Sequence, residues 1–338
     1  MNVKPETAPT AAAPALKRQQ PLQPESFSLA HLSDLHLTTL EHVTSSQLLS
    51  KRMLGYFSWR RKRRIVHSRE IVESLLEDLR VIGPDHIAVT GDLTHLGLPS
   101  EFAEAGQWLT RLGHPEQVTV IPGNHEAYVG RAWGRSSPMW APYLAPDRQQ
   151  DIAGAAGGFP SLRIRGQVAL ISLCSARPSL PFFAIGSLGK RQLTGLEALL
   201  KITGEQGLMR VVLIHHPPAP GATKWRKRLT DSKAFSSVLS RQGAELVLHG
   251  HTHTPTFSEL PTPFGKIPAI GTPSASELNP RSGRRAQYNI YRIRPDGLDW
   301  ELTMTVRGYS ETLGQFRFEQ ERTMTIRRFN PEGNQRRT

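Results

Sequence analysis

The chain has 338 residues, of which 38% are hydrophobic, enough for the core of one large domain or two small ones. Its 42 Lys and Arg residues outnumber the 29 Asp and Glu residues by 13, which favours an anionic substrate or surface. The single Cys174 excludes an internal disulfide and a multi-thiolate metal site, and no window has the roughly 18 apolar residues of a membrane span.

Both ends of the chain are predicted to lack regular structure. Residues 1–25 are rich in Ala and Pro and lack the charged-then-apolar order of a secretory signal, so they predict a disordered tail. Residues 330–338 are polar and basic and predict a second, frayed tail. Residues 26–329 are therefore predicted to form the folded domain. With no signal and no membrane span, we expect the protein to be cytoplasmic.

Segment 38–66 differs from the rest because apolar and aromatic residues alternate with cations. Leu49, Met53 and Phe57 have helical spacing, although Gly55 weakens the helix, and five cations follow at 60–64. Three interpretations remain open: a cap helix packed on its own domain, contact of 48–64 with the anionic inner face of a membrane, or contact with nucleic acid. Of these, nucleic acid is disfavoured.

The following segments alternate between helical and strand patterns. Helices are predicted over 67–81, from an N-cap at Ser100 through Leu112, over 191–202 and over 233–242. Buried strands are predicted at 27–30, 86–90, 118–121, 168–174, 211–214 and 245–248, and antiparallel strands at 288–293 and 298–306. This alternation predicts α/β layers, and the last two strands predict a mixed rather than a purely parallel sheet.

Five of the predicted strands end in residues that commonly bind metals. In chain order, these are Asp34-Leu35-His36, Gly91-Asp92, Gly123-Asn124-His125-Glu126, His215-His216 and Gly250-His251-Thr252-His253. Because open α/β sheets place their sites at the carboxyl ends of strands, we expect these side chains to converge. Carboxylate, imidazole and amide donors without thiolate suit Mn, Fe, Zn or Ni rather than a closed structural zinc site.

In this order, the five motifs resemble the calcineurin-like metallophosphoesterase superfamily over roughly residues 27–275. The His-His-Pro-Pro and Gly-His-Thr-His forms look most similar to its bacterial cyclic-nucleotide and glycerophosphodiesterase branch. The resemblance implies a four-layer α/β/β/α sandwich of two mixed sheets flanked by helices. It also implies a phosphodiesterase with two metal ions (Mn, Fe or Zn), in which a metal-bound hydroxide attacks the phosphorus of an anionic phosphodiester in line.

The resemblance assigns a role to each motif residue. Asp92 would bridge the two ions. Asp34, His36 and His253 would complete one of them, and Asn124, His215 and His251 the other. His125 matches the family's catalytic histidine, which protonates the leaving oxygen or stabilises charge in the transition state. His216, Glu126 and His95 are expected beside these residues, where they would support the ligands or meet the substrate.

One position departs from the protein-phosphatase branch, in which an Asp three residues after the bridging Asp holds the catalytic histidine. Here that position is His95, so either Glu126 or a backbone carbonyl would orient His125. This departure disfavours protein phosphatase activity.

Two other functions remain open. The basic aromatic segment looks similar to that of the UDP-diacylglucosamine hydrolases, which cleave a nucleotide-diphosphate lipid at the membrane, although those enzymes usually have Arg where His125 stands. The second alternative is a nucleic-acid or membrane binding module with a vestigial metal site. The intact set of ligand residues argues against this module, because a decayed site should have lost a ligand.

Overall fold

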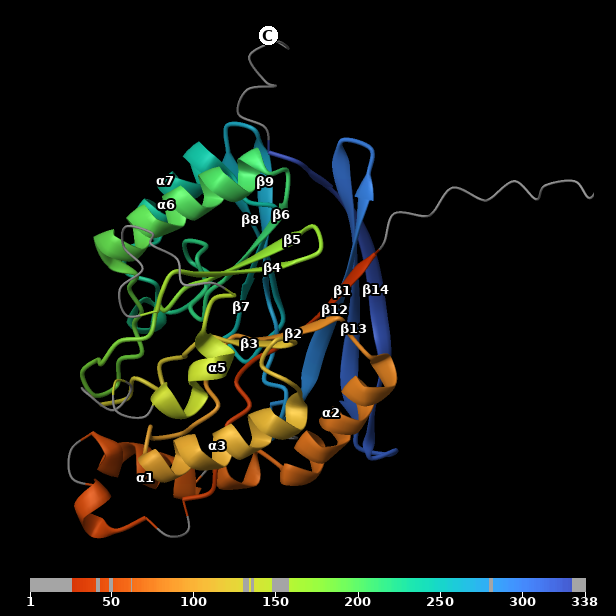
Figure 1. Cartoon of the computed structure of the whole chain (residues 1–338). Coiled ribbons are helices and arrows are strands. Elements are labelled where there is room, and N and C mark those ends of the chain that lie inside the picture. The colour runs from red at the N-terminus through yellow and green to blue at the C-terminus, as the bar shows by residue number, and fades with distance from the viewer. Residues whose placement is uncertain are drawn as a thin grey trace, which may run out of the picture.

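In the computed structural model, the described residues are 26–40, 43–48, 51–61, 63–129, 134, 137–147, 158–279 and 282–329. The two predicted tails and Leu49 lie outside them. Two six-stranded sheets lie at the centre of the molecule, and helices cover their outer faces (Figure 1). None of the described helices has the length and apolar character needed to cross a bilayer.

The first sheet combines strands from both ends of the chain in the order β14-β13-β12-β1-β2-β3. Its strands are β1 (Phe27–Leu32), β2 (His86–Val89), β3 (Val118–Val120), β12 (Gln287–Asp296), β13 (Asp299–Ser310) and β14 (Gln315–Arg327). Strand β1 pairs in parallel with β2 and antiparallel with β12, so the sheet is mixed as predicted. Strand β14 was not predicted from the sequence.

The second sheet has the order β4-β5-β6-β7-β9-β8. Its strands are β4 (Ser161–Arg165), β5 (Val168–Ser172), β6 (Met209–Leu213), β7 (Leu246–His249), β8 (Thr256–Thr262) and β9 (Gly265–Gly271). The four central strands are parallel, whereas β4 and β8 pair antiparallel at the two edges. A separate two-stranded ribbon joins β10 (Leu278–Asn279) to β11 (Arg284–Arg285).

The helices supply the two outer layers. They are α1 (Arg52–Arg61), α2 (Arg69–Ile82), α3 (Pro99–Leu112), α5 (Ala141–Leu144), α6 (Gly189–Glu205) and α7 (Ser232–Gln242), and the 3-10 turns are Ser45–Leu48, Arg63–Ile65, Ser137–Trp140 and Trp225–Lys227. The prediction that Ser100 caps α3 was wrong, because the N-cap is Leu98 and the helix begins at Pro99. Proline suits a first helical position because it has no N–H to satisfy.

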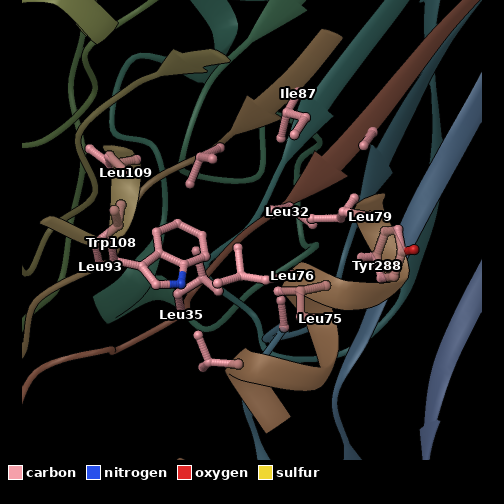
Figure 2. Close-up of a cluster of buried hydrophobic side chains, with 14 of the residues drawn as sticks. Leu32, Leu35, Leu75, Leu76, Leu79, Ile87, Leu93, Trp108, Leu109 and Tyr288 are labelled. Atoms are coloured by element: carbon pink, nitrogen blue, oxygen red, sulfur yellow. The ribbon is translucent and has the colours of Figure 1, made fainter. Parts of the chain in front are cut away.

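Apolar cores between the layers hold them together. Successive strand residues face opposite sides, so Leu29 of β1 packs between the two sheets, whereas Leu32 packs under α2 and α3. Figure 2 shows this helix-side core, where Leu75 and Leu79 of α2 lie near Leu32. A third core lies between α6, α7 and the second sheet. The predicted α/β/β/α sandwich of two mixed sheets is thus confirmed.

The helix predicted in segment 38–66 is present as α1, and its buried residue is Trp59. Trp59 is 4% exposed and belongs to one apolar cluster with Leu96 and Leu98, whereas Met53 and Phe57 are 51% and 54% exposed. The side chain of Arg52 donates to the carbonyl oxygens of Leu96, at 3.1 Å, and Gly97, at 2.7 Å. Helix α1 therefore lies against the loop that follows β2, with its apolar residues 53 and 57 turned outward.

Candidate metal centre

The five motif loops meet at one end of the two sheets. The first three motifs follow β1, β2 and β3 of the first sheet, and the last two follow β6 and β7 of the second. Within the first sheet, the N–H groups of Asp34 and His36 donate to the carbonyl oxygens of Gly91 and Asp92, at 2.9 and 3.0 Å. Between the sheets, the N–H of His251 donates to Asp34 Oδ2 at 2.8 Å. The site is therefore assembled from both sheets.

Each aspartate uses one oxygen to hold a loop and directs the other toward a histidine. Asp34 Oδ1 lies 3.3 Å from His253 Nε2 and accepts no hydrogen bond from the described residues. Asp92 Oδ1 accepts from the N–H of His125 at 2.8 Å, and its Oδ2 lies 3.3 Å from His215 Nε2. Both carboxylates are buried. Two buried carboxylates, each with one oxygen facing a histidine, require a nearby positive charge to balance their own.

Backbone carbonyls fix the tautomers of three further histidines. The Nδ1 atoms of His36 and His215 lie 2.9 and 2.7 Å from the carbonyl oxygens of Thr94 and Thr90, and His251 Nε2 lies 3.0 Å from the Lys227 carbonyl oxygen. A carbonyl can only accept, so each of these nitrogens carries the proton. In the neutral ring the opposite nitrogen then has the lone pair that a metal needs.

His253 follows the same arrangement with a carboxylate as its acceptor. Its Nδ1 lies 2.8 Å from Oε2 of the buried Glu277, which leaves Nε2 facing Asp34. A carboxylate behind an imidazole increases the basicity of the nitrogen that binds a metal. Glu277 has no counterpart among the sequence predictions, because nothing in its local sequence marks it.

The electrostatics of His215 and His253 test whether a cation fits here. Burial is the largest single influence and lowers their pKa values. The surrounding acceptors together outweigh it, chiefly Asp92 with Asp34 at His215, and Asp34 with Glu277 at His253, and they raise both pKa values to about 9. Asn124 adds an amide oxygen, Oδ1, 3.2 Å from His215 Nε2. The site thus attracts positive charge, and its oxygen and imidazole donors suit first-row divalent ions. The residues fit the implied pair of metals.

His125 is held by the main chain. Its Nδ1 lies 2.5 Å from the carbonyl oxygen of His95, and its Nε2 lies 4.0 Å from Asp92 Oδ2. Of the two alternatives for orienting His125, the structure contains the backbone carbonyl. The ring of His95 stacks on that of His36, with centroids 5.0 Å apart.

Glu126 instead connects the loops after β2 and β3. It is buried and accepts hydrogen bonds from the N–H groups of Asp92, Leu93, Thr94 and Gly123, at 2.7 to 2.9 Å. Burial and the charge of Asp92 raise its pKa to about 7. Glu126 therefore positions the backbone of Asp92 and has no exposed surface for substrate.

His216 points away from the aspartates. Its Nδ1 lies 2.8 Å from Ser175 Oγ and its Nε2 lies 3.2 Å from the Ala184 carbonyl oxygen. Burial lowers its pKa to about 3. Its ring nevertheless contacts His251, with centroids 4.5 Å apart. Of the two adjacent histidines, only His215 faces Asp92.

Among the residues that the structure describes, three groups of ligand atoms lie close enough together to hold an ion. Within each group the atoms are no more than 4.8 Å apart, and the groups are His36, Asp92 and His125; Asp92, His215 and His251; and His36, His67 and His253. His67 was not among the predicted site residues. It lies outside the five motifs, at the end of the basic segment, where no local pattern distinguishes it from a surface histidine.

Several of these residues have a strained backbone. The φ angles of Asp34, His36, Asp92, His251 and His253 are 53°, 43°, 58°, 73° and 55°. The left-handed region is unfavourable for residues other than glycine, and such strain concentrates at functional sites. The hydrogen bonds between the loops hold the backbone in this conformation.

Gly123 provides a test of how tightly the loops are packed. A Cβ at this position would overlap the Asp92 carboxylate and lie 2.5 Å from the Asp92 nitrogen. We expect Gly123→Ala to displace Asp92 and to weaken metal binding by at least about tenfold, as the loss of a supporting contact does at other metal sites. Titration of the metal-free protein with Mn²⁺ measures this affinity. Gly134→Ala, where a Cβ meets no atom of the described residues within 4 Å, should bind as wild type.

Comparison with known proteins finds similar phosphodiesterase sequences and a similar fold. A probable cyclic nucleotide phosphodiesterase of Synechococcus sp. is 27% identical over 225 residues, which cover 65% of this chain and 76% of that protein. The glycerophosphodiester phosphodiesterase GpdQ of Enterobacter lignolyticus is 28% identical over 193 residues, 57% of each protein. A dimetal phosphatase from Danio rerio shares the fold, with a TM-score of 0.58 at 14% identity over 90% of this chain and 99% of that one.

The family assignment follows from the length of the match. Residues 27–255, more than half of the chain, match the model of the calcineurin-like phosphoesterase family. This match covers all five motifs and the strands that carry them. The protein therefore belongs to the calcineurin-like phosphoesterase family and is a metal-dependent phosphoric ester hydrolase.

Proposed function

We propose that the protein is a binuclear-metal phosphodiesterase in which Asp92 bridges the two ions. The observation that carries this proposal is that Asp92 belongs to two groups of ligand atoms. One group contains His36 and His125, and the other contains His215 and His251. In this proposal Asp34, His36 and His253 complete one ion, and Asn124, His215 and His251 complete the other. When bound, the ions activate the nucleophile and neutralise charge on the phosphoryl oxygens.

His125 is proposed to handle the proton of the leaving group. Its Nδ1–H is held by the His95 carbonyl, so Nε2 is the nitrogen that faces Asp92. A protonated Nε2 there can donate to the leaving oxygen or stabilise negative charge on it. The side chain is 9% exposed, which keeps this nitrogen in a largely dry environment where a charge interaction is strong.

Hydrolysis of bis(p-nitrophenyl) phosphate tests the proposed activity. We expect purified protein with added Mn²⁺ to release p-nitrophenolate. The rate should fall to background in EDTA and return when excess Mn²⁺ is restored. A protein that binds two ions per chain but never exceeds the buffer rate on any phosphodiester would contradict the proposal.

The substrate class is proposed from the relatives' names. Those relatives are named for cyclic nucleotides and glycerophosphodiesters, both anionic diesters that the excess of basic residues would attract. A panel of cyclic nucleotides, glycerophosphodiesters and nucleotide-diphosphate lipids should give the highest kcat/KM on one of the first two classes. Highest activity on the lipids would reverse this order.

A surface beside the site favours a second candidate, hydrolysis at a membrane. Lys51 precedes α1, and its Nζ donates hydrogen bonds to the carbonyl oxygens of Ser179 and Phe183, at 3.1 and 3.3 Å. The ring of Phe183 contacts that of Trp225, with centroids 5.3 Å apart. These contacts join three segments into one rim, whose exposed apolar residues are Met53, Leu54, Phe57, Leu180, Phe182 and Trp225. Exposed cations accompany them at Arg60, Arg61, Arg226 and Arg228.

The rim surface suits an anionic bilayer, because its apolar tips can enter the headgroup region while the cations pair with phosphates. It is also joined to the metal centre, since His251 Nε2 lies 3.0 Å from the Lys227 carbonyl oxygen. A lipid held at the rim would therefore place its headgroup near the metals. Nucleic acid remains the less favoured occupant, because the apolar tips have no role in binding phosphates.

Liposome co-sedimentation checks the membrane candidate. We expect the protein to pellet with vesicles that contain anionic phospholipid. Arg60→Gln combined with Arg61→Gln should weaken this binding about 30-fold, from about 1 kcal/mol for each cation. Arg292→Gln with Arg317→Gln removes the same charge from exposed positions of the first sheet. Protein that stays in the supernatant, or an equal loss in both pairs, would eliminate this candidate.

A further inference from the structure

Backbone hydrogen bonds between residues 66–68 and 276–278 hold His67 near the proposed metal ligand His253. The N–H of Leu278 donates to the Val66 carbonyl oxygen at 2.7 Å, and the N–H of Ser68 donates to that of Ser276 at 3.4 Å. Between these bonds, His67 and Glu277 form an isolated β-bridge. Glu277 is the residue that holds His253. The position of His67 is thus set by the same short segment that orients His253.

The hydrogen-bond chain behind His67 fixes which of its nitrogens carries a proton. Ser276 Oγ lies 2.5 Å from the carbonyl oxygen of Leu35, which can only accept, so the single hydroxyl proton of Ser276 is used there. His67 Nδ1 lies 2.8 Å from the same Oγ and must therefore donate to it. In the neutral ring the lone pair is then on Nε2. His36, His215 and His253 have the same arrangement, with Nδ1 on a protein acceptor.

The rings around His67 leave room for an ion between them. The ring centroid of His67 lies 4.7 Å from that of His36 and 6.1 Å from that of His253, and one nitrogen from each ring lies within 4.8 Å of the others. Imidazole nitrogens bound to one ion at about 2.1 Å are themselves roughly 3–4 Å apart. His67 and His36 also line a cavity of about 170 Å³, which gives solvent access to this side of the centre.

We propose that His67 is a further nitrogen ligand of the ion that Asp34, His36 and His253 hold. The inference rests on the proposed binuclear centre, but it concerns a residue outside the five motifs. A third imidazole changes the chemistry of this half of the centre, because nitrogen donors favour Zn²⁺, Co²⁺ or Ni²⁺ over Mg²⁺ or Mn²⁺. The two ions then occupy unequal sites, and the one beside His67 is selective for nitrogen-preferring metals.

Metal titration separates this inference from the proposed function. Metal-free wild type, His67→Ala and His114→Ala would each be titrated with Co²⁺ and Zn²⁺ against a chromophoric chelator, with the visible spectrum of bound Co²⁺ recorded. His114 is an exposed histidine with 69% of its side chain accessible, so it controls for the loss of one imidazole. Matching thermal unfolding curves of the metal-free proteins would verify that each variant folds.

We expect His67→Ala to bind one of the two Co²⁺ ions on the order of 100-fold more weakly and to change the spectrum, whereas His114→Ala keeps both properties. Ser276→Ala retains the imidazole but removes its acceptor, and it should give a smaller loss of the same affinity. Wild-type affinity and spectrum in His67→Ala would overturn the inference while leaving the binuclear centre intact. A wild type that binds no ions would instead refute the proposed function itself.

Discussion

Replacing Asp92 by Asn should lower the rate of bis(p-nitrophenyl) phosphate hydrolysis by about 10³-fold or more, a loss typical of removing a group that acts at the reacting centre. The substitution keeps the shape of the side chain but removes the negative charge shared by two groups of ligand atoms. Asp92 is 2% exposed, so solvent does not replace that charge. Initial rates at saturating Mn²⁺ measure the effect.

Asp296→Asn is the matched control. Asp296 is exposed at the end of β12, so the same chemical change there should leave the rate within twofold of wild type. Retention of more than a tenth of the wild-type rate by Asp92→Asn would show that Asp92 does not bridge the ions. Metal content measured on the same samples would distinguish lost binding from lost catalysis.

Glu245→Ala should lower the free energy of unfolding by about 3–5 kcal/mol, the cost of breaking a buried ion pair from one side. Glu245 binds Arg210 through two contacts of 2.9 and 2.6 Å and also accepts from the Arg210 N–H at 2.7 Å. Both side chains are 1% exposed. After the substitution, the Arg210 guanidinium would stay buried beside β6 without its counter-charge. Urea unfolding followed by circular dichroism measures the loss.

An exposed pair of the same type gives the comparison. Arg241 and Glu197 connect α7 to α6 at 2.8 Å, with 50% and 35% of their side chains accessible. Solvent screens this pair, so Glu197→Ala should cost less than about 1 kcal/mol. If Glu245→Ala cost no more than Glu197→Ala, burial of the first pair would contribute nothing to the fold.

The parts of the fold that the sequence predicts are those with strong local patterns. The apolar runs of β1, β2, β3, β6 and β7 and the spacing of Leu75 and Leu79 in α2 follow from burial on one or two faces, and the structure contains all of them. The motif residues could be placed together because each follows such a strand. The structure shows that the side chains of these motif residues lie close together, whereas their roles as metal ligands stay predictions.

Other features depend on contacts that no local pattern contains. Strand β14 alternates weakly, because most of its side chains are exposed on a twisted hairpin with β13. Helix α1 packs through Trp59 because the other members of its cluster, Leu96 and Leu98, come from a loop later in the chain. The neighbourhood of His67 requires a pairing with residues about 210 positions away. Such long-range contacts carry no signal within a single window of sequence.

Because the site draws residues from both sheets, dividing the protein between the sheets would split the site. Asp34, His36, Asp92 and Asn124 follow strands of the first sheet, whereas His215, His251 and His253 follow strands of the second. Neither set contains all the proposed ligands of either ion. Strand β1 also needs β12, from the far end of the chain, as its neighbour. Under the proposed ligand assignment, a gene fragment encoding either part alone would therefore yield an incomplete catalyst, and new specificities would have to arise by changing loops around an undivided unit.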